Sequence, residues 1–310
     1  MTTRSALVGR LADRLGGAPY AAGWSLVQAL PEPVAVRLFD AAADLAVRRG
    51  GARIDQLTAN LRRVEPYTDG HLRIGGRRGA PDLVGAAMRS YARYWREVFR
   101  LPLTGRQRIV EGMVTVGEHR LRESVASADG TILALPHTGN WDHAGAWCAA
   151  TGAPFTTVAE RLRPASVFDR FVAFRESLGM EVLPLTGGSR PVGAVLRSRL
   201  EAGGMLCLLA DRDLSATGVE VDFFGSRARM PAGPAALAVR TGATLLPVTL
   251  SFTPTGWRAV FHEPVPAGDL RTMTQQLADA FARGIAEHPA DWHMLQPLWP
   301  DDLPARRAPG

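Results

Sequence analysis

The N-terminal third of the chain carries apolar residues at helical spacing. Leu7, Leu11 and Leu15 recur every four residues, which predicts an amphipathic helix over residues 4–15. The same periodicity continues in four further segments: 20–30, 34–47, 54–64 and 83–99. We therefore expect residues 1–125 to form a helical N-terminal region.

The last of these segments has an aromatic stripe along one face. The stripe consists of Tyr91, Tyr94, Trp95 and Phe99. Four arginines are interleaved with it: Arg89, Arg93, Arg96 and Arg100. An aromatic stripe is most often core packing, whereas the interleaved arginines also fit a surface that faces lipid or an acyl chain. The sequence leaves both interpretations open.

From residue 130 the pattern changes to short apolar runs that alternate with helical segments. Six runs predict strands: 131–135, 155–158, 181–185, 205–210, 244–250 and 257–261. Five segments predict helices: 142–150, 167–178, 192–201, 231–240 and 269–287. This alternation is typical of an α/β fold with a mostly parallel sheet flanked by helices. We expect this core to span residues 126–300, followed by a tail over residues 301–310.

The composition excludes several classes of function. Of the 310 residues 46% are hydrophobic, which is enough to build one large core. All 36 basic residues are arginines, which against 30 acidic residues leaves a net charge of +6. Without lysine, a Schiff-base lysine and a P-loop are excluded. Nucleic-acid binding is not expected, because no motif for it accompanies the basic excess, and contact with anionic lipid explains that excess equally well.

Three further features concern cellular location. Cys148 and Cys207 stand singly without metal-ligand spacing, which favours free thiols in a reducing compartment. The N-terminus shows no signal-peptide pattern. No window holds 18 consecutive apolar residues, so a spanning helix is not expected, and peripheral binding to a membrane stays open.

Ionisable residues follow three of the predicted strands. His137 and Asp142 come after the first strand, Glu160 and Arg161 after the second, and Asp211 after the fourth. The carboxyl ends of parallel strands form one edge of a sheet, and ligands bind at that edge in such folds. We therefore expect a functional site there.

His137 is the candidate base of this site. It follows a strand and enters a glycine-containing turn at a helix start, where helix N–H groups favour developing negative charge. Asp142 lies in the first turns of that helix, where it is placed to accept a hydrogen bond from one imidazole nitrogen. The other nitrogen is then free to take a proton from a hydroxyl. The alternative is a histidine that only caps the helix.

Two other chemistries find less support. His137, Asp142 and His143 are metal-ligand types, but no HExxH motif or cysteine partner accompanies them, so no metal is expected. No GxSxG elbow is present, and nothing in the sequence supports an acyl-serine intermediate.

The segment HTGNWDHAGAW, residues 137–147, resembles the His-x4-Asp motif of the lysophospholipid and lipid A late acyltransferase superfamily. Four further blocks follow in order, over residues 156–164, 174–188, 208–248 and 289–300. Together they make the chain similar to the actinobacterial phosphatidylinositol mannoside acyltransferases. The resemblance is dense from residue 130 to 300, and NLRRV at 60–64 fits as well.

The resemblance implies roles for particular residues. The family's base falls on His137, its orienting acid on Asp142, and its active-site arginine on Arg175. A supporting acid falls on Asp211, where related enzymes can carry Glu; the shorter side chain leaves a direct contact with His137 open. Four more residues are implied in substrate binding, the last two at a phosphate: Glu160, Arg161, Arg227 and Arg229. The alternatives are a solvated pair between Arg175 and Glu176, and ordinary loop charges for the last two arginines.

The implied reaction is direct acyl transfer. An acyl-CoA, with palmitoyl as the usual chain, donates to the 6-hydroxyl of the mannose on inositol position 2 of a phosphatidylinositol mannoside. Acyl-CoA is a co-substrate, and no cofactor or metal is implied. One alternative is an acyltransferase for another lysophospholipid or glycolipid acceptor. A second is a non-catalytic lipid-binding homologue.

Because the implied acceptor stays in a bilayer, we expect peripheral binding at the cytoplasmic face of the plasma membrane. Segments 4–15 and 20–47 supply apolar residues for this: Trp24, Leu26, Leu30 and Phe39. They also supply basic residues that attract an anionic membrane surface: Arg4, Arg10, Arg14, Arg37, Arg48 and Arg49. The alternative is that these helices simply pack on the α/β core.

Overall fold

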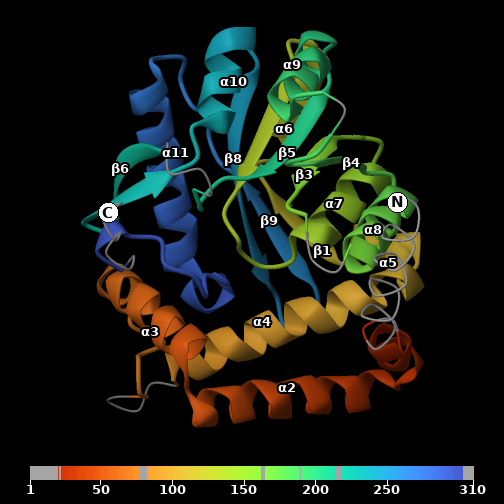
Figure 1. The fold of residues 1–310 in the computed structure, drawn as a ribbon, viewed down its shortest axis with the longest axis vertical. Helices are drawn as coiled ribbons and strands as arrows, with labels where there is room; N and C mark the ends of the chain where they lie inside the picture. The colour runs from red at the N-terminus through yellow and green to blue at the C-terminus, as the bar shows by residue number, and fades with distance from the viewer. Residues whose placement is uncertain are drawn as a thin grey trace, which may run out of the picture.

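A seven-stranded sheet forms the centre of the protein in a computed structural model that describes residues 20, 22–76, 82–161, 165–188, 190–213 and 218–302 (Figure 1). Its strands are β1 (Met113–Val116), β2 (Thr131–Leu135), β3 (Thr156–Ala159), β4 (Glu181–Pro184), β5 (Met205–Leu209), β8 (Thr244–Phe252) and β9 (Trp257–Phe261). They are ordered β1-β9-β8-β2-β5-β3-β4, and only the β8–β9 pair is antiparallel. The predicted α/β class with a mostly parallel sheet is confirmed.

Both faces of the sheet are buried. In β2, Leu133 and Leu135 belong to one apolar cluster, whereas Ile132 and Ala134 belong to another on the opposite face. This arrangement explains why the strand reads as a continuous apolar run instead of an alternating one. On the first face lie α6 (Glu118–Ser127), α7 (Trp141–Ala150) and α8 (Ala165–Ser177). On the second lie α9 (Val192–Glu201), α10 (Gly233–Thr241) and α11 (Leu270–Glu287).

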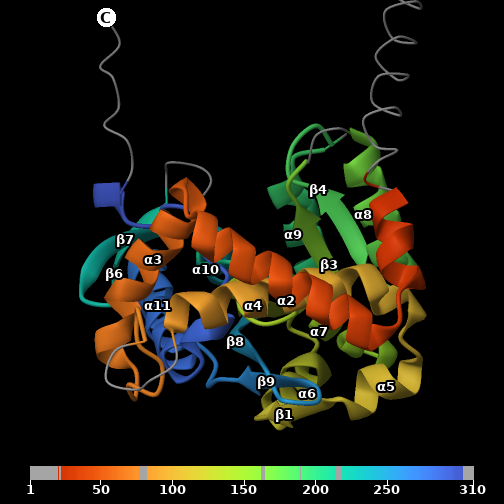
Figure 2. The same ribbon diagram turned by 90° about the horizontal axis from the view of Figure 1, so that it is seen from below.

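The N-terminal helices lie beneath the sheet (Figures 1 and 2). They comprise residues 22–29, α2 (Glu32–Arg49), α3 (Ala52–Val64), α4 (Leu83–Arg100) and the short α5 (Arg106–Glu111). Asp82 begins α4, because its carboxylate accepts hydrogen bonds from the backbone N–H groups of Val84 and Gly85. Helix α2 packs against the outer side of α4. The helix predicted over residues 4–15 and the tail beyond residue 302 lie outside the described residues.

The aromatic stripe of α4 packs on the core. Tyr94 is buried, while Tyr91, Trp95 and Phe99 are partly exposed and contact the first apolar cluster. Trp24 and Phe171 complete this aromatic group, with ring centroids 5.2 Å apart. The stripe therefore packs into the core through Tyr94, and its other three rings each keep part of their surface exposed.

Several elements were not predicted individually. Helices α5 and α6 are among them, and edge strand β1 lies within residues 1–125, which were expected to be helical. A hairpin of β6 (Val219–Phe223) and β7 (Ser226–Met230), which packs against α11, was not predicted either. Its two-residue turn places both Phe224 and Gly225 at positive φ, which is strained for phenylalanine. In the described part of the chain, every helix is too short or too polar to cross a membrane.

Close packing between α11 and the sheet makes one glycine sensitive to substitution. A Cβ on Gly284 would collide with the side chain of Thr249 on β8. Gly284→Ala should therefore lower the free energy of unfolding by about 1–3 kcal/mol, measured by urea denaturation. Gly193 in α9 has open space around it, so Gly193→Ala should be neutral or slightly stabilising. Equal effects of the two substitutions would contradict this packing.

Candidate active site

His137 and Asp211 form a hydrogen-bonded pair at the carboxyl edge of the sheet. Imidazole Nδ1 lies 2.5 Å from Asp211 Oδ1, and the backbone N–H of His137 donates to Asp211 Oδ2 at 2.9 Å. The Asp211 side chain is fully buried, whereas 26% of the His137 side chain is exposed. A carboxylate accepts, so Nδ1 carries the proton and the neutral imidazole keeps its lone pair on Nε2.

Strand register brings the two residues together. β2 and β5 are parallel neighbours with Leu135 opposite Leu209, and each functional residue follows two positions later. The chain then turns sharply at Gly139, which has φ +55°. A Cβ there would lie 2.9 Å from the Leu250 carbonyl carbon, so only glycine fits this turn.

Asp211 is an ionised buried acid with several donors around it. Burial alone would raise the pKa of Asp211, but the His137 side chain, the Trp292 indole and the His137 backbone N–H together lower it. Trp292 Nε1 donates to Asp211 Oδ2 at 3.0 Å. Trp292 is a site residue that the sequence did not reveal; only its place in the similar block 289–300 pointed to this segment.

The structure corrects the role expected for Asp142. Among the described residues no hydrogen bond joins Asp142 to His137. Instead, Arg175 donates from Nε to Asp142 Oδ1 at 2.6 Å and from Nη2 to Oδ2 at 3.1 Å, and the Tyr94 hydroxyl donates to Oδ2 at 2.9 Å. The physical reason is the position of Asp142 in the first turn of α7, two residues after the Asn140 N-cap. This position directs its carboxylate toward α4 and α8 and away from the imidazole.

Arg175 is committed to this buried pair. It forms neither the solvated pair with Glu176 nor a free cation beside His137. Burial would lower the pKa of Arg175, but the charge and hydrogen bonds of Asp142, together with Tyr94, outweigh burial and raise the pKa. Burial, followed by the Asp142 charge, raises the pKa of Tyr94, which keeps the hydroxyl protonated as a donor. Loss of Asp142 is thus expected to act through the packing of three helices and not through the imidazole.

The other predicted binding residues have partners of their own outside the His137 pair, or are exposed. Glu160 is exposed, and Arg161 donates to the backbone carbonyls of Thr186 and Gly187 after β4. Arg227 and Arg229 alternate on the exposed face of the β6–β7 hairpin, where Arg227 lies 3.4 Å from Glu220. In the described structure none of the four forms a hydrogen bond or ion pair with His137 or Asp211.

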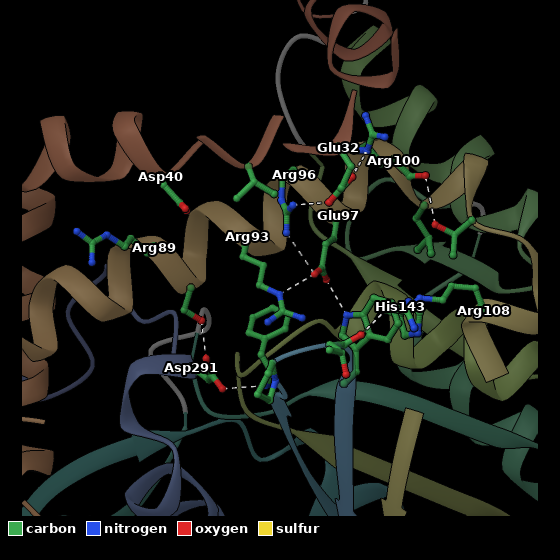
Figure 3. Close-up of a pocket in the computed structure, with 18 of the residues that line it drawn as sticks. Glu32, Asp40, Arg89, Arg93, Arg96, Glu97, Arg100, Arg108, His143 and Asp291 are labelled. Carbon is green, nitrogen blue, oxygen red and sulfur yellow. Dashed lines mark hydrogen bonds and ion pairs between the residues drawn. The ribbon is translucent and has the colours of Figure 1, made fainter. Parts of the chain in front are cut away.

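A cleft of about 860 Å³ lies between α2, α4 and the β8–β9 connection (Figure 3). Its charged lining residues are Glu32, Asp40, Arg89, Arg93, Arg96, Glu97, Arg100, Arg108 and Asp291. Arg93 Nε lies 2.7 Å from Glu97 Oε1, and Arg96 and Arg100 both pair with Glu32. Glu97 also accepts from Asn140. The ion pairs of Glu32 fasten α2 to α4, and the hydrogen bond from Asn140 fastens α4 to the start of α7. His137 is not among the described residues that line the cleft.

Comparison with known proteins identifies the family of the chain. The chain matches the model of the bacterial lipid A biosynthesis acyltransferase family over residues 15–301, and it belongs to that family. The protein is thus a member of an acyltransferase family.

Individual relatives are phosphatidylinositol mannoside acyltransferases. The chain is 50% identical over 292 residues to the one from Mycolicibacterium smegmatis, covering 93% of this chain and 92% of that protein. It is 49% identical over 293 residues to one from Mycobacterium tuberculosis, covering 93% and 90%. The resemblance seen in the sequence is confirmed.

The Arg175–Asp142 pair gives a direct stability test. Arg175→Ala leaves a buried carboxylate without its cation, so the free energy of unfolding should fall by about 3–5 kcal/mol in urea denaturation. Arg227→Ala, which removes an exposed pair, should leave it nearly unchanged. A fully stable Arg175→Ala protein with weakened use of acyl-CoA would instead support a donor-binding role for Arg175.

Proposed function

We propose that this protein transfers a long acyl chain, palmitoyl in the usual case, from acyl-CoA to the 6-hydroxyl of the mannose on inositol position 2 of a phosphatidylinositol mannoside. The observation that supports the proposal is the partly exposed His137 imidazole, which is hydrogen-bonded to the buried Asp211 carboxylate. The acceptor is inferred from the names of relatives that are about half identical over nearly their whole length.

His137 acts as the general base in this proposal. Nε2 takes the proton of the mannose hydroxyl while Asp211 stabilises the imidazolium through Nδ1–H. The hydroxyl oxygen bonds to the thioester carbonyl carbon, the C–S bond breaks, and the departing sulfur takes the proton back from Nε2 as the thiol of CoA. The first turn of α7 begins four residues after His137, and its N–H groups favour negative charge on the carbonyl oxygen. This series of reaction steps requires neither a covalent enzyme intermediate nor a metal.

Aromatic side chains beside His137 suit a long acyl chain. Trp141 packs edge-on to the His137 ring with centroids 5.5 Å apart, and Tyr94 lies against Trp141 at 4.0 Å. The partly exposed Trp95 and Phe99 continue this surface along α4. Binding of an acyl chain to this aromatic surface would contribute about 0.8 kcal/mol of favourable transfer free energy for each methylene that it buries.

The surface of α2 supports peripheral membrane binding at the cytoplasmic leaflet. Its exposed apolar residues lie on the side away from α4: Val34, Leu38 and Leu45. Leu26 adds to them, whereas Trp24 is buried in the core as the packing alternative expects. Exposed Arg37, Arg48 and Arg49 accompany this face and would meet lipid phosphates.

The catalytic test is acyl transfer from radiolabelled acyl-CoA to a panel of mannosylated and unmannosylated inositol phospholipids. His137→Ala should lower kcat by about 10²–10⁴-fold in a protein that stays folded, with a lower melting temperature because the buried Asp211 carboxylate loses one of its donors. Asp211→Asn should cause a comparable loss, because the imidazole loses its charged partner. His71→Ala, at an exposed histidine, is the control. His137→Ala turnover within a few-fold of wild type would refute the mechanism, and equal transfer to other glycolipids would refute the acceptor.

The membrane test is co-sedimentation with vesicles that contain phosphatidylinositol. The double variant Leu38→Glu, Leu45→Glu should bind at least about 10-fold more weakly, because two exposed leucines no longer enter the bilayer surface. Added salt should also weaken wild-type binding. Val239→Glu, at an equally exposed site on α10, should bind as wild type does. A wild-type protein that does not co-sediment with these vesicles at low salt would contradict the proposal.

A further inference from the structure

The segment Asp291–His293 fastens both members of the His137–Asp211 pair. The backbone N–H of His293 donates to the His137 carbonyl at 2.8 Å, and Gly139 N–H donates to the Asp291 carbonyl at 2.9 Å. Between these two bonds, Trp292 Nε1 donates to Asp211 Oδ2 at 3.0 Å. We name residues 291–293 the clasp. The clasp is the one described segment that bonds to the base through its backbone and to the acid through a side chain.

The clasp is itself anchored on two elements. Asp291 Oδ1 accepts from the Ser90 hydroxyl of α4 at 2.6 Å, and Oδ2 accepts from the Phe252 backbone N–H of β8 at 2.8 Å. Ser90 Oγ also lies 2.9 Å from His293 Nε2. The position of the clasp is therefore fixed independently of the pair that it holds.

Trp292 has little freedom to move. Its side chain is fully buried among Phe223, Phe224 and Trp299, with ring centroids 6.0, 6.4 and 6.1 Å away. The direction of the indole N–H is thus set by packing. This is the condition under which one hydrogen bond can fix the orientation of another side chain.

We propose that Trp292 is a positioning residue for acyl transfer. Asp211 Oδ2 accepts from two rigid donors, the indole and the His137 backbone N–H, which together fix the carboxylate plane. Oδ1 then stays aimed at His137 Nδ1, and Nε2 stays aimed at the substrate hydroxyl. Without the indole donor, the carboxylate can rotate, and the base loses its orientation although both members of the pair remain. This inference rests on the proposed function.

The matched pair of variants is Trp292→Phe and Trp299→Phe. Both tryptophans are fully buried in the same aromatic cluster, but Trp299 Nε1 donates to the Phe223 backbone carbonyl and not to the pair. Trp292→Phe should lower kcat about 10-fold with little change in KM for acyl-CoA, since one charge-assisted hydrogen bond is lost. Trp299→Phe, at a similar loss of melting temperature, should keep kcat within about twofold of wild type. Equal losses of kcat in the two variants would overturn the proposal.

An isosteric replacement separates the N–H from the packing. Benzothienylalanine at position 292, with sulfur in place of the indole N–H, keeps the ring volume, so the protein should fold even where Trp292→Phe does not. It should reproduce the 10-fold loss of kcat. Wild-type kcat in this protein would overturn the proposal.

A double-mutant cycle tests whether Trp292 acts through Asp211. In an Asp211→Ala background, Trp292→Phe should lower the residual kcat no further; a further 10-fold loss, as for independent sites, would overturn the proposal. If Asp211→Ala and His137→Ala themselves kept wild-type kcat, the proposed general-base mechanism would fail, and this inference with it. A failure confined to the Trp292 variants would leave the proposed function standing.

Discussion

Asp211 is a fully buried carboxylate, and the arrangement of the site follows from the need to stabilise its charge. An isolated ionised acid in such a place would lose several kcal/mol of solvation or take up a proton. Three donors from two residues prevent this: the His137 imidazole, the His137 backbone N–H and the Trp292 indole. The β2–β5 register, the turn at Gly139 and the anchoring of residue 292 are all conditions for those donors to converge.

Asp142 is the second buried carboxylate of the site, and donors stabilise its charge as they do that of Asp211. Asp142 is neutralised by Arg175 from α8 and by Tyr94 from α4, so one charge holds three helices together. Tyr94 in turn supports Trp141, whose ring contacts His137. The two buried acids thus have different partners: Asp211 holds the His137 imidazole, and Asp142 holds Tyr94 of the aromatic surface beside it.

The sequence predicted the α/β class and six of the seven strands of the sheet. The signal was clearest in β2 and β8, because strands buried on both faces read as continuous apolar runs. The sequence missed β1, a four-residue edge strand with alternating exposure, and the β6–β7 hairpin, whose turn uses Phe224 at positive φ in place of a typical turn residue. It also placed His137, Asp142 and Asp211 at one sheet edge. It paired the imidazole with the wrong acid, because distance along the chain favoured Asp142, whereas the side-chain direction is set by the first turn of α7. The contact with Trp292, 81 residues from Asp211, depends on tertiary packing that no local pattern reports.

The central claim is that Asp211 holds His137 in the Nδ1–H form and leaves Nε2 unprotonated to accept a proton from a hydroxyl. Nitrogen-15 NMR of histidine-labelled protein near neutral pH tests it most directly, with His137→Asn to assign the resonance. The account predicts a protonated Nδ1 and an unprotonated Nε2, with a far-downfield Nδ1–H proton that disappears in Asp211→Ala. A His137 found in the Nε2–H form, or an Nδ1 signal unaffected by Asp211→Ala, would contradict it.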